Sequence, residues 1–118
     1  VFNGNKYFAK NLTFSEKGKK ISFVLDTGIN DRIVPFTKDA DLLIIESSFD
    51  AESMGRAKEY NHLTCEQGAN IAKKAKIDKL ILTHISQRYD NNPLKVLKQA
   101  KKIFRNSEMA KDFDVFEV

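Results

Sequence analysis

Three short apolar runs in this chain each end at a side chain that can bind a metal ion or transfer a proton. Asp26 follows Ile-Ser-Phe-Val-Leu, Glu46 follows Leu-Leu-Ile-Ile, and His84 follows Leu-Ile-Leu-Thr. Runs of this length and composition predict strands. In open α/β sheets, ligands bind beyond the carboxyl ends of the strands. If the three strands are parallel neighbours, their last side chains converge at one edge of the sheet and form a site.

Each of these residues also has an ordinary structural explanation. In this explanation, Asp26, which precedes Thr-Gly, only forms a turn. Glu46 caps the segment that follows it, and His84 is a hydrogen-bonded histidine at the end of a strand. The coincidence of three such strand ends favours a shared site over three separate structural roles.

His62 is the only other histidine, and it lies directly before a predicted helix. Thr64 and Gln67, three residues apart, match a capping box that fixes the first helical turn. An imidazole held there suits a general acid, because histidine titrates near neutral pH. A surface histidine without a chemical role explains the placement equally well. A nucleophilic pair of Cys65 and His62 is a further alternative, although no third residue that would orient it is evident.

The elements that must position these residues alternate between strands and helices. Strands are predicted at Tyr7–Thr13, Ile21–Leu25, Leu42–Ile45, Lys79–Thr83 and Asp114–Val118, and helices at 65–76 and 94–104, with Pro93 in the first turn of the second. The segment 47–61 has no clear period and predicts a loop or a frayed helix. Gly28 is expected to adopt a turn conformation closed to other residues. This alternation predicts an α/β sheet with covering helices.

The composition excludes several classes of protein. With 118 residues, the chain is one domain or part of one. Its 42% hydrophobic and 31% charged residues are ordinary for a globular protein and argue against disorder. No apolar run approaches the ~20 residues of a membrane span, so no membrane partner is expected. A single cysteine excludes a disulfide framework, and without a visible signal peptide it predicts a cytoplasmic location.

The charge is mildly basic, with 20 Lys and Arg against 16 Asp and Glu, a net charge of +4. This excess fits a nucleic-acid partner, since lysine and arginine neutralise phosphates, and it fits many other proteins. Lysines gather near the end of the first predicted helix and along the second. They form either a solvated face or a surface that follows RNA.

Four strings occur in one order along the chain: Asp26-Thr27-Gly28, Glu46-Ser47-Ser48-Phe49, Asn61-His62-Leu63-Thr64 and Thr83-His84-Ile85-Ser86-Gln87-Arg88-Tyr89. Together they resemble the C-terminal half of the ribonuclease Z family, metallo-β-lactamase-fold endonucleases that trim tRNA 3′ ends. The resemblance covers about residues 21–118. It implies half of a metallo-β-lactamase-like αββα sandwich, with a mixed sheet and covering helices. Residues 1–118 would then be the C-terminal part of a single domain.

The resemblance implies a role for each candidate residue. Asp26 would bridge two metal ions, and His84 would be a terminal ligand of one of them. Glu46 and His62 would form a pair in which His62 protonates the leaving 3′ oxygen. Arg88 would support that pair or hold the scissile phosphate. The implied cofactor is zinc, two ions per complete site, with other divalent ions as alternatives. The implied partners are precursor tRNA and a second copy in a homodimer.

The sequence departs from the family pattern in two ways. The motif that usually reads His-Glu-Ala-Thr is here Ile45-Glu46-Ser47-Ser48, and the main metal motif, His-x-His-x-Asp-His, is absent from the 118 residues. One metal-binding histidine and one aspartate cannot complete a dinuclear zinc site. We therefore expect either a C-terminal piece whose N-terminal half is missing, or a degenerate half-domain. The alternatives in function are a related hydrolase of small phosphodiesters, such as cyclic nucleotides, and a non-catalytic half-domain that acts as a partner subunit.

Overall fold

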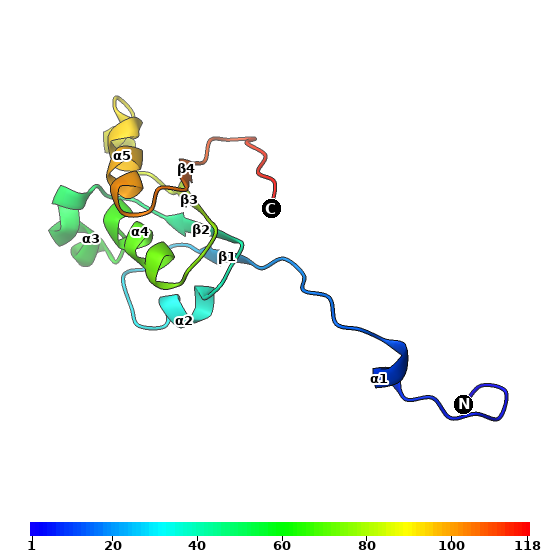
Figure 1. Ribbon diagram of the computed structural model, residues 1–118. Coiled ribbons are helices and arrows are strands. Elements are labelled where there is room, and N and C mark those ends of the chain that lie inside the picture. Colours follow the sequence, from blue (N-terminus) through cyan, green and yellow to red (C-terminus); the bar gives the residue numbers. More distant parts are fainter.

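The computed structural model describes residues 1–118, which form a body of one sheet and several helices preceded by a long N-terminal segment. In chain order the elements are α1 (Ala9–Leu12), β1 (Ile21–Val24), α2 (Ile33–Thr37), β2 (Leu42–Glu46), the 3₁₀ turn η1 (Ala51–Ser53), α3 (Met54–Tyr60), α4 (Cys65–Lys74), β3 (Lys79–Thr83), the 3₁₀ turn η2 (Gln87–Tyr89), α5 (Pro93–Ile103) and β4 (Ser107–Met109). Residues 1–20 are all exposed and run away from the body (Figure 1). None of the helices is long and apolar enough to cross a lipid bilayer.

The four strands form one parallel sheet in the order β1-β2-β3-β4. Val24 pairs with Ile45, Ile45 with Leu82, and Leu82 with Met109. Parallel neighbours need crossover connections, and each connection here contains at least one helix. The predicted α/β architecture with covering helices is confirmed. The mixed sheet that we expected is not what these four strands form, because none of them is joined to its neighbour by a hairpin.

The helix that precedes β3 begins where its capping residues predict. The Thr64 side chain accepts a hydrogen bond from the Gln67 backbone, and the Gln67 side chain accepts one from the Thr64 backbone. A Cβ on Gly68 would lie 3.2 Å from a methyl carbon of Ile45. Glycine at this position therefore lets α4 approach β2 closely and complete the core between sheet and helices.

The helices cover one face of the sheet and leave part of the other open. On the covered face, Leu43, Ile45, Leu80 and Leu82 belong to one core cluster. On the opposite face of the edge strand and just after it, Ile21, Phe23 and Leu25 are 46%, 59% and 50% exposed. Parallel sheets are normally covered on both faces. In contrast, this sheet leaves apolar side chains exposed on one face at β1.

Two predicted strands are wrong. The segment Tyr7–Thr13 contains the short helix α1, because no other strand lies beside it to complete a ladder. The last strand is Ser107–Met109 and not Asp114–Val118. The Leu80 amide donates to the Asn106 carbonyl, and the Ala110 amide donates to the Leu82 carbonyl. Residues 107–109 thus form a strand because they pair with the free edge of β3, although their sequence carries no strand pattern.

Candidate functional site

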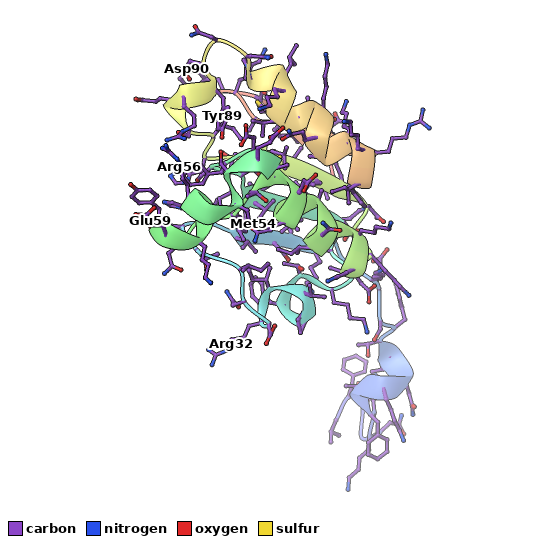
Figure 2. All side chains as sticks on the ribbon, turned by 90° about the vertical axis from the view of Figure 1, so that its left-hand side faces the viewer. Arg32, Met54, Arg56, Glu59, Tyr89 and Asp90 are labelled. Carbon is purple, nitrogen blue, oxygen red and sulfur yellow. The ribbon has the colours of Figure 1, made fainter.

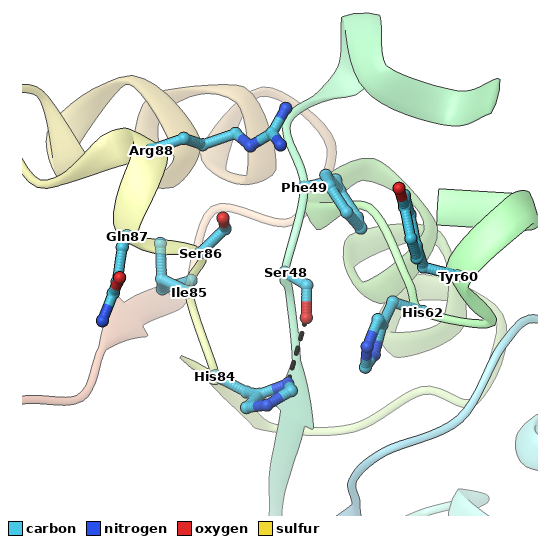
Figure 3. A pocket seen from close by; sticks show the side chains of 9 residues that line it. All are labelled: Ser48, Phe49, Tyr60, His62, His84, Ile85, Ser86, Gln87 and Arg88. Atoms are coloured by element: carbon cyan, nitrogen blue, oxygen red, sulfur yellow. Dashed lines mark hydrogen bonds between the residues drawn. The ribbon is translucent and has the colours of Figure 1, made fainter. Parts of the chain in front are cut away.

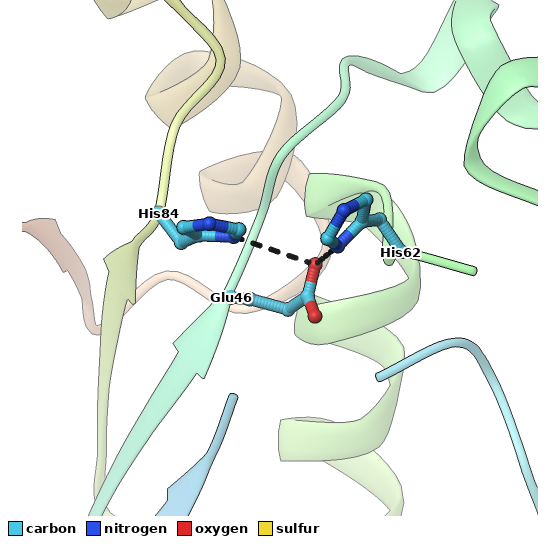
Figure 4. A group of neighbouring side chains, drawn as sticks. All are labelled: Glu46, His62 and His84. Carbon is cyan, nitrogen blue, oxygen red and sulfur yellow. Dashed lines mark hydrogen bonds and ion pairs between the residues drawn. The ribbon is translucent and has the colours of Figure 1, made fainter. Parts of the chain in front are cut away.

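The carboxyl ends of β1, β2 and β3 meet at one edge of the sheet. Glu46 Oε2 lies 3.9 Å from His84 Nδ1 and 2.9 Å from His62 Nδ1 (Figure 4). Asp26 lies at the rim, with Oδ1 4.0 Å from His62 Nδ1 and a side chain that is 87% exposed. The structure therefore brings together the three strand-end residues and His62.

Two residues close to the carboxyl ends of β1 and β3 have left-handed backbone. Asp26 has φ 53° and His84 has φ 54°. Positive φ is uncommon outside glycine, although aspartate and histidine adopt it more often than most residues. The two strands turn sharply at these positions and present their last side chains at the sheet edge.

Glu46 is the centre of the hydrogen-bonding network. Its side chain is completely buried. Oε1 accepts a hydrogen bond from the Thr27 backbone, and Oε2 accepts bonds from the Leu63 backbone at 3.1 Å and the Ser48 hydroxyl at 3.1 Å. Two backbone N–H groups and a hydroxyl satisfy a buried carboxylate that would otherwise be costly to desolvate. The network also fixes the direction in which Glu46 meets His62.

His62 is held on the short connection between α3 and α4. Asn61 ends α3 in a left-handed C-cap conformation, and the His62 amide donates to the Ala57 carbonyl at 2.8 Å. Thr64 then caps α4. The imidazole is 23% exposed and its ring centroid lies 5.2 Å from that of His84. A rigid helix end on each side therefore sets the position of this imidazole.

Gly28 is required for a different reason from the one we expected. Its backbone is not left-handed. A Cβ on Gly28 would lie 2.7 Å from the Asn61 Oδ1 atom, which real Cβ contacts essentially never show. The absence of a side chain lets the loop after β1 pack against the segment that carries His62.

A pocket of about 390 Å³ opens beside the two histidines (Figure 3). Its lining residues are Ser48, Phe49, Tyr60, His62, His84, Ile85, Ser86, Gln87 and Arg88. The Arg88 guanidinium lies 5.3 Å from the centre of the Phe49 ring, which itself stacks against Tyr60. Arg88 makes no hydrogen bond or ion pair with Glu46 or His62, so its place is the rim of the pocket. A phosphate in this pocket would meet the imidazoles on one side and a guanidinium on another.

Cys65 does not serve as a nucleophile. It is completely buried at the start of α4, and burial raises the pKa of its thiol to about 12. The thiol donates a hydrogen bond to Gln99 and makes none with His62. The alternative of a Cys65–His62 pair is therefore wrong, since a reactive cysteine needs an accessible thiolate.

The chain is 43% identical to the ribonuclease Z of Listeria welshimeri over 119 aligned positions, which cover 100% of this chain and 38% of that protein. It is 41% identical to the ribonuclease Z of Ligilactobacillus salivarius over 105 positions, which cover 88% of this chain and 33% of that protein. No protein-family model matches the sequence.

Solved structures give the same result. The metallo-β-lactamase-fold protein YhfI from Bacillus subtilis superposes with a TM-score of 0.72 at 31% identity, over 82% of this chain and 39% of that one. Human tRNase Z, short form, superposes with a TM-score of 0.64 at 33% identity, over 85% of this chain and 34% of that one.

Over its whole length, this chain is similar to part of the ribonuclease Z of Listeria welshimeri. The resemblance seen in the four sequence strings is confirmed, as is the metallo-β-lactamase-like fold. The chain spans between a third and two fifths of the ribonuclease Z proteins it matches. The four strings around Asp26, Glu46, His62 and His84 all lie within the matched region of the first relative.

The residues present fit part of a divalent-metal site of the ribonuclease Z type. One ligand atom each from Glu46, His62 and His84 lies within 4.8 Å of the others. Both oxygens of Glu46 already accept hydrogen bonds from protein donors, which leaves the imidazoles of the two histidines as the freer members of this group.

Sequence reasoning missed several residues that shape this site. The backbone amides of Thr27 and Leu63 hold Glu46, and no side-chain pattern reveals a backbone donor. Phe49 and Tyr60 form one wall of the pocket. Ser48 links Glu46 to His84. Its spacing of two residues from Glu46 was the one available signal, because alternate residues of an extended chain share a side.

Proposed function

We propose that residues 1–118 are the C-terminal part of a zinc-dependent ribonuclease Z that removes 3′ trailers from precursor tRNA. The observation that carries the proposal is the contact between buried Glu46 and His62, whose Oε2 and Nδ1 atoms lie 2.9 Å apart, with His84 Nδ1 3.9 Å from the same oxygen. The similarity to named ribonuclease Z proteins over the whole chain supports the choice of substrate.

His62 is the proposed general acid. His62 Nδ1 is hydrogen-bonded to Glu46, so Nε2 is the nitrogen that carries the proton to be transferred. Because the buried Glu46 contacts Nδ1, it orients the imidazole with the other nitrogen toward the pocket. His62 then protonates the 3′ oxygen that leaves when the phosphodiester is cut.

Asp26 and His84 are the proposed metal ligands of this chain. When bound, two zinc ions would stabilise the charge that develops on the phosphoryl oxygens. Asp26 offers two oxygens at an exposed position, and the Ser48 hydroxyl orients the His84 ring. We propose Arg88 as a contact for the scissile phosphate, because its guanidinium stands at the rim of the pocket.

The missing ligands are proposed to come from the N-terminal half of the same fold. Two observations support this part of the proposal. The chain lacks the His-x-His-x-Asp-His motif. The face of the sheet that bears Ile21, Phe23 and Leu25 is open, as a sheet is when its covering layer is absent. A homodimer follows from the resemblance alone. A cytoplasmic location is supported by the single unpaired cysteine.

A grafted enzyme tests the proposal. The segment of Listeria welshimeri ribonuclease Z that aligns with this chain is replaced by residues 1–118. The purified protein is then assayed on a precursor tRNA with a labelled 3′ trailer. We expect cleavage at the 3′ end of the tRNA, and loss of cleavage when the graft carries His62→Ala. The parent enzyme with the equivalent histidine changed is the matched control.

The alternatives predict other outcomes. A folded graft that cuts a cyclic nucleotide but leaves precursor tRNA intact would indicate a hydrolase of small phosphodiesters. A folded graft that binds zinc and cuts neither substrate would indicate a non-catalytic half-domain. Either result contradicts the proposed function.

A further inference from the structure

Ser48 occupies a position between the two halves of the site. It lies two residues beyond Glu46 and is 5% exposed, and Figure 3 shows its hydroxyl in contact with His84. The Ser48 oxygen lies 3.1 Å from Glu46 Oε2 and 3.0 Å from His84 Nδ1. No other side chain bridges Glu46 to His84.

The direction of both hydrogen bonds follows from counting hydrogens. A carboxylate only accepts, and a serine hydroxyl has one hydrogen to donate. Glu46 already receives the Thr27 and Leu63 backbone N–H groups, which can only donate, so it is held as an acceptor. Ser48 therefore donates its hydrogen to Glu46. Its oxygen is left to accept, and the only group available to it is His84 Nδ1.

The tautomer of His84 follows from this. Because the Ser48 oxygen accepts from Nδ1, the single N–H hydrogen of the neutral imidazole must be on Nδ1. The lone pair is then on Nε2. His84 makes no other hydrogen bond through its side chain, and that side chain is 54% exposed. The nitrogen that carries the lone pair is thus free for a ligand from outside the chain.

We propose that Ser48 is a positioning residue that holds His84 in the Nδ1–H tautomer, with Nε2 available to a divalent cation. Glu46 sets the direction of the Ser48 hydroxyl, and the hydroxyl sets the tautomer. The tautomer itself depends only on groups of this chain, and its use for metal binding rests on the proposed function. The same carboxylate then orders both imidazoles, His62 directly and His84 through one hydroxyl.

The neighbouring serine provides a matched control. Ser47 is as deeply buried as Ser48, but its hydroxyl has no hydrogen-bond partner. Ser47→Ala removes the same atom from the adjacent position without touching the network. Ser48→Thr keeps a hydroxyl on the same carbon and tests rescue.

The tautomer is read directly by long-range ¹H–¹⁵N correlation spectra of the ¹⁵N-labelled 118-residue chain, without metal and above pH 8. Only His62 and His84 contribute imidazole signals, which makes assignment simple. We expect His84 to show the Nδ1–H pattern in the unchanged chain, in Ser47→Ala and in Ser48→Thr. In Ser48→Ala we expect the Nε2–H form to become the major one.

Two results would overturn the proposal. One is an Nε2–H pattern for His84 in the unchanged chain, a measurement that needs no variant. The other is a Ser48→Ala variant whose backbone amide spectrum is folded and whose His84 pattern is unchanged.

The grafted enzyme separates this proposal from the proposed function. There we expect Ser48→Ala to weaken zinc affinity by ~10–100-fold, the usual effect of removing a group that orients a ligand, and Ser48→Thr to restore it. Unchanged zinc affinity in Ser48→Ala would contradict the role of Ser48 toward the metal. Failure of the unaltered graft to cut precursor tRNA would contradict only the proposed function, because the tautomer is measured in the chain itself.

Discussion

Glu46 Oε2 lies 2.9 Å from His62 Nδ1, and the Glu46 side chain has no contact with solvent while the His62 ring is 23% exposed (Figure 4). The pair is therefore asymmetric. Its carboxylate is fixed inside the protein by three further donors, and its imidazole reaches the pocket. This arrangement supports the proposed role of His62 as a general acid, since the buried partner orients the exposed ring.

Glu46→Gln tests how firmly this network depends on a carboxylate. In glutamine, an NH₂ group replaces one of the two carboxylate oxygens, and an NH₂ group cannot accept a hydrogen bond. At least one buried hydrogen bond is therefore lost, and its donor is left without a partner. We expect the free energy of unfolding to fall by ~1–3 kcal/mol in urea titrations. Glu59→Gln, at an exposed position of α3, is the control and should change stability by less than ~0.5 kcal/mol. Equal stability of the two variants would contradict the network.

Thr64→Ala tests the capping box that places His62. The Thr64 hydroxyl accepts the Gln67 amide at 3.2 Å, and alanine leaves that amide without a partner. We expect a loss of ~1 kcal/mol in the free energy of unfolding, measured by urea titration. Thr64→Ser keeps the hydroxyl and should retain most of that stability. A serine variant as unstable as the alanine variant would assign the effect to the lost methyl group instead.

The ion pair of Asp50 and Lys95 predicts a pH dependence of stability. Burial raises the pKa of Asp50, but the hydrogen bond and charge of Lys95 oppose this effect, and the pKa of Asp50 lies below its usual value. A carboxyl group whose pKa is lower in the folded state stabilises the fold above its unfolded pKa, and this contribution is lost as the pH falls through the folded value. The pair joins the loop after β2 to α5 at an Nζ–Oδ2 distance of 2.7 Å.

Lys95→Met removes the partner of Asp50 and keeps a long side chain. We expect a lower Tm than that of the unchanged chain at pH 7, and a difference that shrinks as the pH falls below about 4, where Asp50 loses its charge. Thermal unfolding at pH 7, 5 and 3 measures it. Lys98→Met, on the same helix and exposed, is the control. A Tm difference that stays constant from pH 7 to pH 3 would show that the pair contributes no pH-dependent stability.

The sequence was most informative where local chemistry determines structure. The strands that end at Glu46 and His84 and the capping box at Thr64 are local signals, and all three are confirmed. The strand Ser107–Met109 could not be predicted, because its partner β3 selects it across more than 20 residues of chain. Pairing with a distant strand overrides a weak local pattern.

The site could be predicted in its residue types but not in its connections. Asp26, Glu46 and His84 could be grouped because parallel strands share an edge. The bridging hydroxyl of Ser48 and the amides of Thr27 and Leu63 follow from the paths of two loops, which no residue pattern encodes. The open face of β1 was equally invisible, since a buried and an uncovered strand carry the same apolar residues.

The isolated chain should bind zinc weakly and cut no RNA. It supplies Asp26 and His84 as ligands, and metal sites normally need three or four preorganised donors. Equilibrium dialysis against zinc and a cleavage assay on precursor tRNA measure the two properties. Tight zinc binding with robust cleavage by residues 1–118 alone would show that the ligand set is already complete.

The central claim is that His62 moves a proton while His84 holds a metal, and the grafted enzyme tests it with two variants. In His62→Ala we expect zinc content to stay near that of the unaltered graft while single-turnover cleavage slows by ~10²–10⁴-fold, the usual contribution of a general acid. In His84→Ala we expect zinc content and cleavage to fall together. The decisive measurement is zinc per chain by elemental analysis of the His62→Ala graft, made beside its cleavage rate. Zinc near the unaltered level with slow cleavage is the predicted result, and a loss of zinc equal to that of His84→Ala would make His62 a ligand and contradict the account.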